Sequence, residues 1–166
     1  MKSSLLRFAF QEIAFRAMAV VLTMSITGVA MSAETEVPLP KLPAGAGAVD
    51  ANAPKTFTTT KSGLKYRVLR EGKGAKPKAT NAVEVHYHGW LDNGKVFDSS
   101  YDRKESISFG LNQVIPGWTE GMQLVGEGGM IELEIPSELG YGARGAGGVI
   151  PPNAKLHFLV ETLKVK

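Results

Sequence analysis

The amino-acid sequence predicts an α+β domain built of several antiparallel strands and one short helix. Segments in which apolar and polar residues alternate recur between residues 57 and 166, and this period of two is typical of half-buried strands. One segment, residues 114–129, instead spaces its apolar residues as a helix does. The turn signal Asn93–Gly94 separates two of the strand-like segments, as expected of an antiparallel hairpin. Together these patterns indicate an antiparallel sheet with one helix.

Four strands are predicted in the first half of the domain. Residues 63–72 alternate and end at a glycine, which indicates a strand followed by a turn. Residues 81–91 set two valines and Tyr87 against a glutamate and two histidines, the pattern of a half-buried strand. A short strand is predicted over residues 96–97, after the Asn-Gly turn, and a brief one within residues 105–110.

The helix is predicted within residues 114–129. Pro116 suits its first turn, because an N–H at that position has no acceptor inside the helix. The spacing i, i+3, i+4, i+7 gives one apolar face, and the glycines from Gly126 end the helix. The residues on this face are Trp118, Gly121, Met122 and Val125.

Two further strands complete the expected sheet. Residues 129–136 alternate, and Glu132 and Glu134 share a face that we expect to be exposed. Residues 154–165 form a long final strand in which the alternation slips in phase near Thr162.

Composition excludes several kinds of function. The formal charge is +3, from 19 Lys and Arg against 16 Asp and Glu, without a basic run, so nucleic-acid binding is not expected. The absence of cysteine excludes disulfides, thiolate catalysis and cysteine-ligated zinc.

The first 56 residues are expected to lie outside the folded domain. Residues 1–33 are cationic and then free of charge from residue 17, with small residues at the end, which predicts a signal peptide and a periplasmic or secreted protein. The alternative is an uncleaved anchor in the inner membrane formed by residues 17–33. Residues 34–56 are rich in Pro, Ala and Gly and predict a flexible tether. Residues 57–166 form the domain.

The stretch GYGARGAGGVIPP, residues 140–152, begins with the spacing G-x-G-x-x-G. A dinucleotide site needs a helix that starts at these glycines, but Pro151 and Pro152 follow them and an apolar strand comes next. We therefore expect a long loop that carries Tyr141, Val149 and Ile150. Apolar groups on a loop near Trp118 indicate an apolar binding cleft, with Trp118 either at its floor or in the core.

Candidates for metal or acid–base chemistry are few. His86 and His88 share one strand face, two residues apart, without an obvious third ligand, so a solvated strand face is favoured over zinc binding. Asp98 follows an apolar Phe97, and it is either a turn residue or a carboxylate at the rim of the cleft.

Three blocks of the sequence together resemble the FKBP-type peptidyl-prolyl cis-trans isomerases, including their secreted bacterial members. The blocks are VHYHGWLDNGKVFDSS, VIPGWTEGMQLVGEGG and IPSELGYGARGAGGVIPPNAKLHFLVETL. The resemblance covers residues 57–166. It implies an antiparallel sheet of five or six strands, a half-barrel wrapped around one short helix, and an isomerase (rotamase) activity that assists protein folding. It implies no metal and no cofactor.

The resemblance also implies a set of site residues. Asp98, Tyr141 and Tyr87 would be catalytic. The substrate-binding residues would be Phe97, Val114, Ile115, Trp118, Val149, Ile150, Phe158, Arg103 and Ile107. Arg103 would pair with the aspartate. Ile107 replaces a frequent aromatic and Ala146 an occasional histidine, and the segment after Phe109 is shorter, so peptide preference and macrolide affinity are expected to differ from those of relatives.

The partners implied are proline-containing polypeptides and macrolide inhibitors. We expect a monomer, because the long dimerisation helix that precedes the domain in some secreted relatives has no counterpart in the tether. The alternative function is a non-catalytic binding module for proline peptides, or a chaperone, on the same fold.

Overall fold

The computed structural model describes residues 35–166, so the predicted signal peptide lies outside the described residues. Seven strands form one antiparallel sheet in the order β1-β2-β6-β7-β3-β4, and β5 also pairs with β3. The strands are β1 (Thr58–Thr59), β2 (Lys65–Arg70), β3 (Ala82–Leu91), β4 (Val96–Ser99), β5 (Ile107–Gly110), β6 (Met130–Ile135) and β7 (Leu156–Val165). The predicted fold class is confirmed, and the seventh strand is the two-residue β1.

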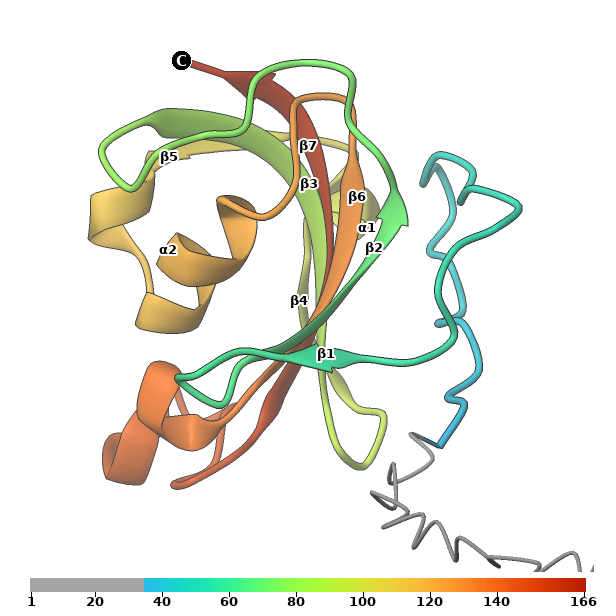
Figure 1. Ribbon diagram of the computed structural model, residues 1–166. Helices are drawn as coiled ribbons and strands as arrows, with labels where there is room; N and C mark the ends of the chain where they lie inside the picture. The colour runs from blue at the N-terminus through green and yellow to red at the C-terminus, as the bar shows by residue number, and fades with distance from the viewer. Residues whose placement is uncertain (1–34) are drawn as a thin grey trace, which may run out of the picture. The chain divides into compact units, whose positions relative to one another are not determined.

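The helical elements are short. The two α-helices are α1 (Ser100–Arg103) and α2 (Pro116–Met122), and the 3₁₀ turns are η1 (Leu111–Gln113), η2 (Ser137–Leu139) and η3 (Gly142–Arg144). Among residues 35–166, no helix has the length and apolar character needed to cross a membrane. Figure 1 shows α2 lying against one side of the curved sheet.

The two longest strands, β3 and β7, pair with each other along their length and carry the predicted phase slip. Val85 pairs with Thr162, but the next residue back, Glu84, pairs with Lys164. Leu163 is therefore the extra residue of a bulge, and its side chain is exposed. The change of phase near Thr162 is thus confirmed as a bulge in the ladder.

Helix α2 begins at Pro116, as predicted, and packs closely on β6. A Cβ on Gly117 would lie 2.5 Å from Ile135 Cγ2, and one on Gly121 would lie 2.8 Å from Leu133 Cδ1. Glycine at these positions lets the helix backbone approach the sheet. The predicted apolar face is buried, although the helix itself ends earlier than its pattern, at Met122.

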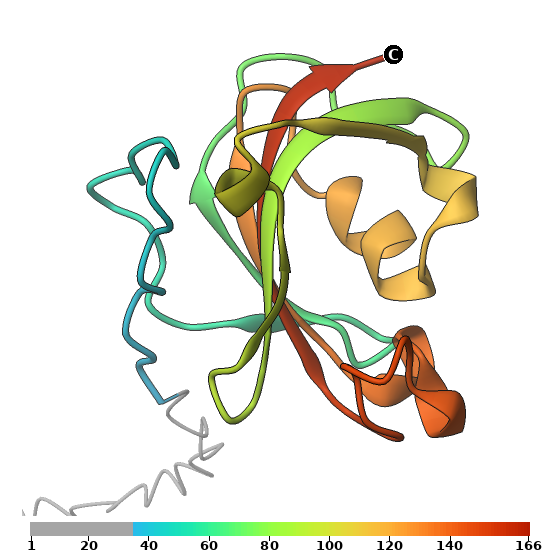
Figure 2. The ribbon, with the colours of Figure 1, turned by 180° about the vertical axis from the view of Figure 1, so that it is seen from behind.

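The segment predicted to be a flexible tether packs against the sheet. Residues 35–56, called the strap below, run along the side of the sheet opposite α2 (Figures 1 and 2). Arg67 donates to the carbonyls of Val37 and Pro38, at 2.7 Å each. Apolar side chains of the strap pack against a small cluster on this outer face of the sheet. The cluster contains Leu69, Met130 and Leu159, and the strap contributes Leu42, Ala46, Val49 and Ala53.

The strap also corrects the expectation for Glu132. This residue was expected to be exposed, but only 5% of its surface is accessible. Its Oε2 accepts a hydrogen bond of 2.7 Å from Arg67 Nε, and Arg67 is 2% exposed. Because the strap covers this face, both faces of β6 are buried and alternation along the strand no longer marks a wet side.

Candidate functional site

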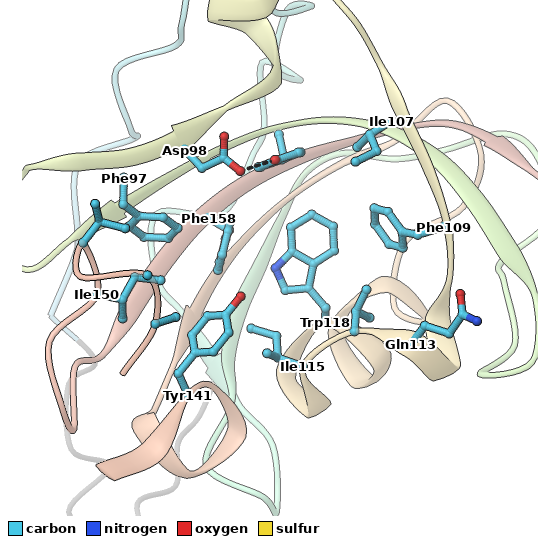
Figure 3. Close-up of a pocket in the computed structure, with 15 residues that line it drawn as sticks. Phe97, Asp98, Ile107, Phe109, Gln113, Ile115, Trp118, Tyr141, Ile150 and Phe158 are labelled. Atoms are coloured by element: carbon cyan, nitrogen blue, oxygen red, sulfur yellow. Dashed lines mark hydrogen bonds between the residues drawn. The ribbon is translucent and has the colours of Figure 1, made fainter. Parts of the chain in front are cut away.

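A cavity of about 620 Å³ opens between α2, the concave side of the sheet and the loop before β7 (Figure 3). This is a size that accommodates a small ligand or a short stretch of peptide. Its lining is mainly aromatic and aliphatic. The lining residues are Tyr87, Phe97, Asp98, Ile107, Phe109, Gln113, Val114, Ile115, Trp118, Tyr141, Ala146, Gly147, Val149, Ile150 and Phe158.

The floor of the cavity is the indole of Trp118. The side chain is almost buried, at 5% exposed, yet it lines the cavity. Phe158 and Tyr87 meet it edge to face, with ring centroids at 5.1 and 5.5 Å. Edge-to-face contacts of this kind fix the orientation of aromatic rings. The indole face is therefore held in place below the opening.

One wall depends on a glycine in β3. A Cβ on Gly89 would lie 2.6 Å from Phe97 Cζ and 2.8 Å from Phe158 Cε1. These two rings also meet edge to face, at 5.4 Å between centroids. The absence of a side chain at Gly89 lets both rings lie against the strand backbone, which sets the width of the cavity on this side.

The rim carries a polar cluster of three side chains. The Tyr87 hydroxyl donates to Asp98 Oδ2, and Arg103 Nη1 donates to Asp98 Oδ1. Arg103 Nη2 also donates to the Tyr87 hydroxyl oxygen, at 2.9 Å. Figure 3 shows Asp98 with one hydrogen-bonded oxygen at the edge of the apolar lining.

The cluster keeps a carboxylate next to the cavity. Burial alone would raise the pKa of Asp98, but the hydrogen bonds from Tyr87 and Arg103 outweigh it and lower the pKa below its ordinary value. Burial and the hydrogen bond to Asp98 raise the pKa of Tyr87. At neutral pH the rim therefore presents an ionised Asp98 that accepts from a protonated Tyr87.

Two further polar groups lie at the cavity. The Ile115 N–H, just before α2, has no hydrogen-bond acceptor among residues 35–166. An unpaired backbone donor in a cavity wall is a binding point for a carbonyl. The hydroxyl of Tyr141 points into the space beside Trp118 (Figure 3), and this tyrosine is 41% exposed.

The glycine-rich stretch is a loop, as expected; it includes the short 3₁₀ turn η3, but no α-helix starts at its glycines. Ala146 and Ile150 form an isolated bridge, and between them Gly147 and Gly148 have φ of +55° and +68°. These left-handed conformations favour glycine. The loop presents Val149, which is 45% exposed, and Ile150 to the cavity.

The structure brings eleven of the twelve predicted site residues to this cavity. Arg103 is the exception, because it lies behind Asp98 and contacts it from outside the lining. Four residues line the cavity but were not predicted as site residues: Phe109, Gln113, Ala146 and Gly147. Phe109 could have been found, since it shares a strand face with Ile107, whereas no sequence signal marks Gln113.

The predicted solvated face of β3 is in fact partly buried. His86 stacks on Tyr101 and its Nδ1 lies 2.9 Å from Ser100 Oγ. Burial lowers the pKa of His88, so this imidazole is neutral at neutral pH. Residues 35–166 contain no group of three metal-ligating side chains placed to hold an ion.

Comparison with known proteins gives consistent matches. The model of the family FKBP-type peptidyl-prolyl cis-trans isomerase matches residues 73–163. A probable FKBP-type peptidyl-prolyl cis-trans isomerase of Haemophilus influenzae is 56% identical over 111 residues, which are 67% of this chain and 46% of that protein. An FK506-binding protein of Neisseria meningitidis is 57% identical over 99 residues, 58% of this chain and 91% of that protein.

Solved structures agree. The crystal structure of FkpA from Escherichia coli superposes with a TM-score of 0.65 at 51% identity, over 66% of this chain and 51% of that one. The structure of AtFKBP13 gives a TM-score of 0.61 at 37% identity, over 66% of this chain and 98% of that one. An FKBP-type peptidyl-prolyl cis-trans isomerase FkpA of Aeromonas hydrophila is 55% identical over 117 residues, which are 70% of this chain. The chain spans less than half the length of the Haemophilus and Aeromonas relatives, 46% and 43%.

Proposed function

Because this chain belongs to the family of FKBP-type peptidyl-prolyl cis-trans isomerases, we propose that it accelerates rotation about X–Pro bonds in folding polypeptides. The observation that carries the proposal is the open cavity whose floor is Trp118. A proline ring is compact and apolar, and it fits a cavity of this lining.

The proposed mechanism is non-covalent. Rotation about the X–Pro bond crosses a barrier of about 18–20 kcal/mol because amide resonance is lost in the twisted state. The twisted amide has less charge separation than the planar one, so a dry apolar cavity favours it. An acceleration from tens of seconds to milliseconds is about 10⁴-fold, or roughly 5–6 kcal/mol. Positioning and exclusion of water are able to supply an effect of this size.

Each polar group has a proposed role around the proline. The free Ile115 N–H and the Tyr141 hydroxyl would hold substrate carbonyls, which fixes the peptide on both sides of the rotating bond. Asp98, ionised and held by Tyr87 and Arg103, would be a polar contact near the carbonyl of the residue before proline. Trp118, Phe97 and Phe158 would enclose the ring.

An isomerase assay on the purified protein tests this function. We expect turnover of a short proline peptide, and inhibition by a macrolide that competes for the same cavity. Tyr141→Phe should lower kcat/KM by about tenfold, as expected for the loss of one hydrogen bond used in the transition state. Absence of turnover in the folded wild-type protein would refute the proposal.

The alternative is a binding module or chaperone without catalysis. It predicts that proline peptides bind in the cavity without faster isomerisation, and that aggregation of a proline-free client is suppressed. Measuring both quantities on the same preparation separates the two functions.

We also propose that residues 1–33 direct export and that the mature protein is a monomer. The first part rests on the cationic start followed by a charge-free run. Mass spectrometry of the protein from fractionated cells would show whether these residues are removed, and light scattering would give the oligomeric state. A membrane-bound, uncleaved chain would favour the anchor instead.

A further inference from the structure

A buried polar cluster lies on the outer face of the sheet, away from the cavity, and has no part in the mechanism above. At its centre is Glu161 of β7, which is 9% exposed. Arg70 forms an ion pair with Glu161 Oε1. Tyr101 donates its hydroxyl to Glu161 Oε2 at 2.9 Å, and the strap amide of Gly47 donates to the same oxygen at 3.3 Å.

The strap completes this cluster from the other side. Arg70 Nη1 donates to the carbonyl of Ala48 at 2.8 Å, next to the amide that Glu161 accepts from. A Cβ on Gly47 would lie 2.3 Å from Arg70 Nη1 and 2.6 Å from Glu161 Oε1. A side chain at position 47 would therefore displace the charged ends of Arg70 and Glu161.

Tyr101 belongs to α1, and α1 also carries Arg103. This helix has four residues, which is too short to be stable without tertiary contacts. Several specific contacts hold it: Tyr101 is 6% exposed and stacks on His86, and Ser100 Oγ accepts from the Tyr87 amide at 2.8 Å. The helix thus lies between the buried cluster and the polar rim of the cavity.

The side chain of Arg103 depends on a fixed position of helix α1. Its side chain is 47% exposed, and a long exposed arginine loses considerable rotamer entropy when it is held in one geometry. Yet it donates to both Asp98 and Tyr87. A fixed backbone at Arg103 reduces the number of conformations that the side chain would otherwise sample.

We propose that Tyr101 is a positioning residue: its hydrogen bond to Glu161, supported by the Gly47 amide of the strap, fixes α1 and holds Arg103 against Asp98 and Tyr87. This inference rests on the proposed function, because it assigns a supporting role to the proposed site. It also makes the strap, which lies outside the region matched by the family, part of the support for that site.

The first test does not require activity. The pKa of the Asp98 carboxyl is measured by NMR titration in Tyr101→Phe, which removes the hydroxyl and keeps the ring. It should rise by at least half of the shift seen in Arg103→Ala, because Arg103 spends less time at the carboxylate. The control Tyr66→Phe removes a tyrosine hydroxyl that is not part of the cluster around Glu161, and it should leave the Asp98 pKa unchanged. An unchanged Asp98 pKa in Tyr101→Phe would overturn the inference.

The second test is a double-mutant cycle on kcat/KM. If Tyr101 acts through Arg103, the double variant Tyr101→Phe with Arg103→Ala should be no slower than Arg103→Ala alone. Losses that multiply would show a merely structural role and would contradict the proposal.

If Tyr101→Phe fails to fold, the variant Gly47→Ala replaces it, and the Asp98 pKa and kcat/KM are measured in the same way. The matched control is Ala51→Ser, at an exposed position of the strap. If the wild type shows no turnover but Tyr101→Phe still raises the Asp98 pKa, the proposed function is refuted and the positioning role of Tyr101 is not.

Discussion

At the scale of single residues, the site combines an apolar floor with one ionised group whose state is set by its neighbours. Asp98 is 42% exposed, and hydrogen bonds from Tyr87 and Arg103 offset the cost of partly burying its charge. The residues that surround proline in the proposed mechanism carry no titratable group other than Asp98 and the tyrosines. The pH dependence of catalysis should therefore report Asp98.

The low pKa of Asp98 predicts how the rate depends on pH. The pKa of Asp98 in the folded protein lies below 3.8. The carboxylate therefore stays ionised as the pH falls, until the pH reaches this lowered pKa. We expect kcat/KM to stay constant from about pH 8 to about pH 5 and to fall only at lower pH. NMR exchange spectroscopy on a proline peptide measures this without a coupling enzyme. Asp98→Asn should remove the fall of kcat/KM at low pH. If kcat/KM of this variant still falls at low pH, another group is responsible.

At the scale of elements, the sequence predicts strands better than it predicts what covers them. Alternation located β2, β3, β6 and β7, and even the bulge near Thr162, because each of these strands has one face in the core. The strap was missed because its apolar side chains show no periodicity and its other contacts use main-chain carbonyls, which residue types do not report. Glu132 was predicted to be exposed for the same reason. An acidic residue on a strand face indicates a face exposed to solvent unless a covering segment is known.

The ion pair of Arg67 and Glu132 links β2, β6 and the strap, and it gives a second prediction. Burial raises the pKa of Glu132, against the opposing effect of Arg67. Arg67→Met would leave a buried carboxyl without its partner and should lower the free energy of unfolding by about 3–5 kcal/mol. The double variant Arg67→Met with Glu132→Leu should recover most of this loss. Urea denaturation of the variants measures both effects, and a double variant as unstable as the single one would show that the strap contacts, not the buried charge, dominate.

At the scale of the whole molecule, the sheet separates two sets of interactions that share its strands. The concave side holds α2 and the cavity, and the outer side holds the strap over Leu69, Met130 and Leu159, each 0% exposed. The fold class and eleven of the residues that line the cavity could be named from the sequence because the motifs of the concave side are distinctive, whereas their roles remain a proposal. The strap on the outer side lies N-terminal to residues 73–163, the range that the family model matches.

Removing the strap tests whether the two sides are coupled. A chain that begins at residue 57 exposes the three outer side chains, each worth about 1.5–3 kcal/mol when buried, but it no longer has to order the strap. We expect a net loss of about 2 kcal/mol in the free energy of unfolding and a smaller m-value, because less surface is buried. A chain that begins at residue 35 keeps every contact described and is the matched control. If the cluster around Glu161 supports the rim, the shorter chain should also show a raised Asp98 pKa and a lower kcat/KM. Loss of stability with both site properties intact would mean that the outer face serves stability alone.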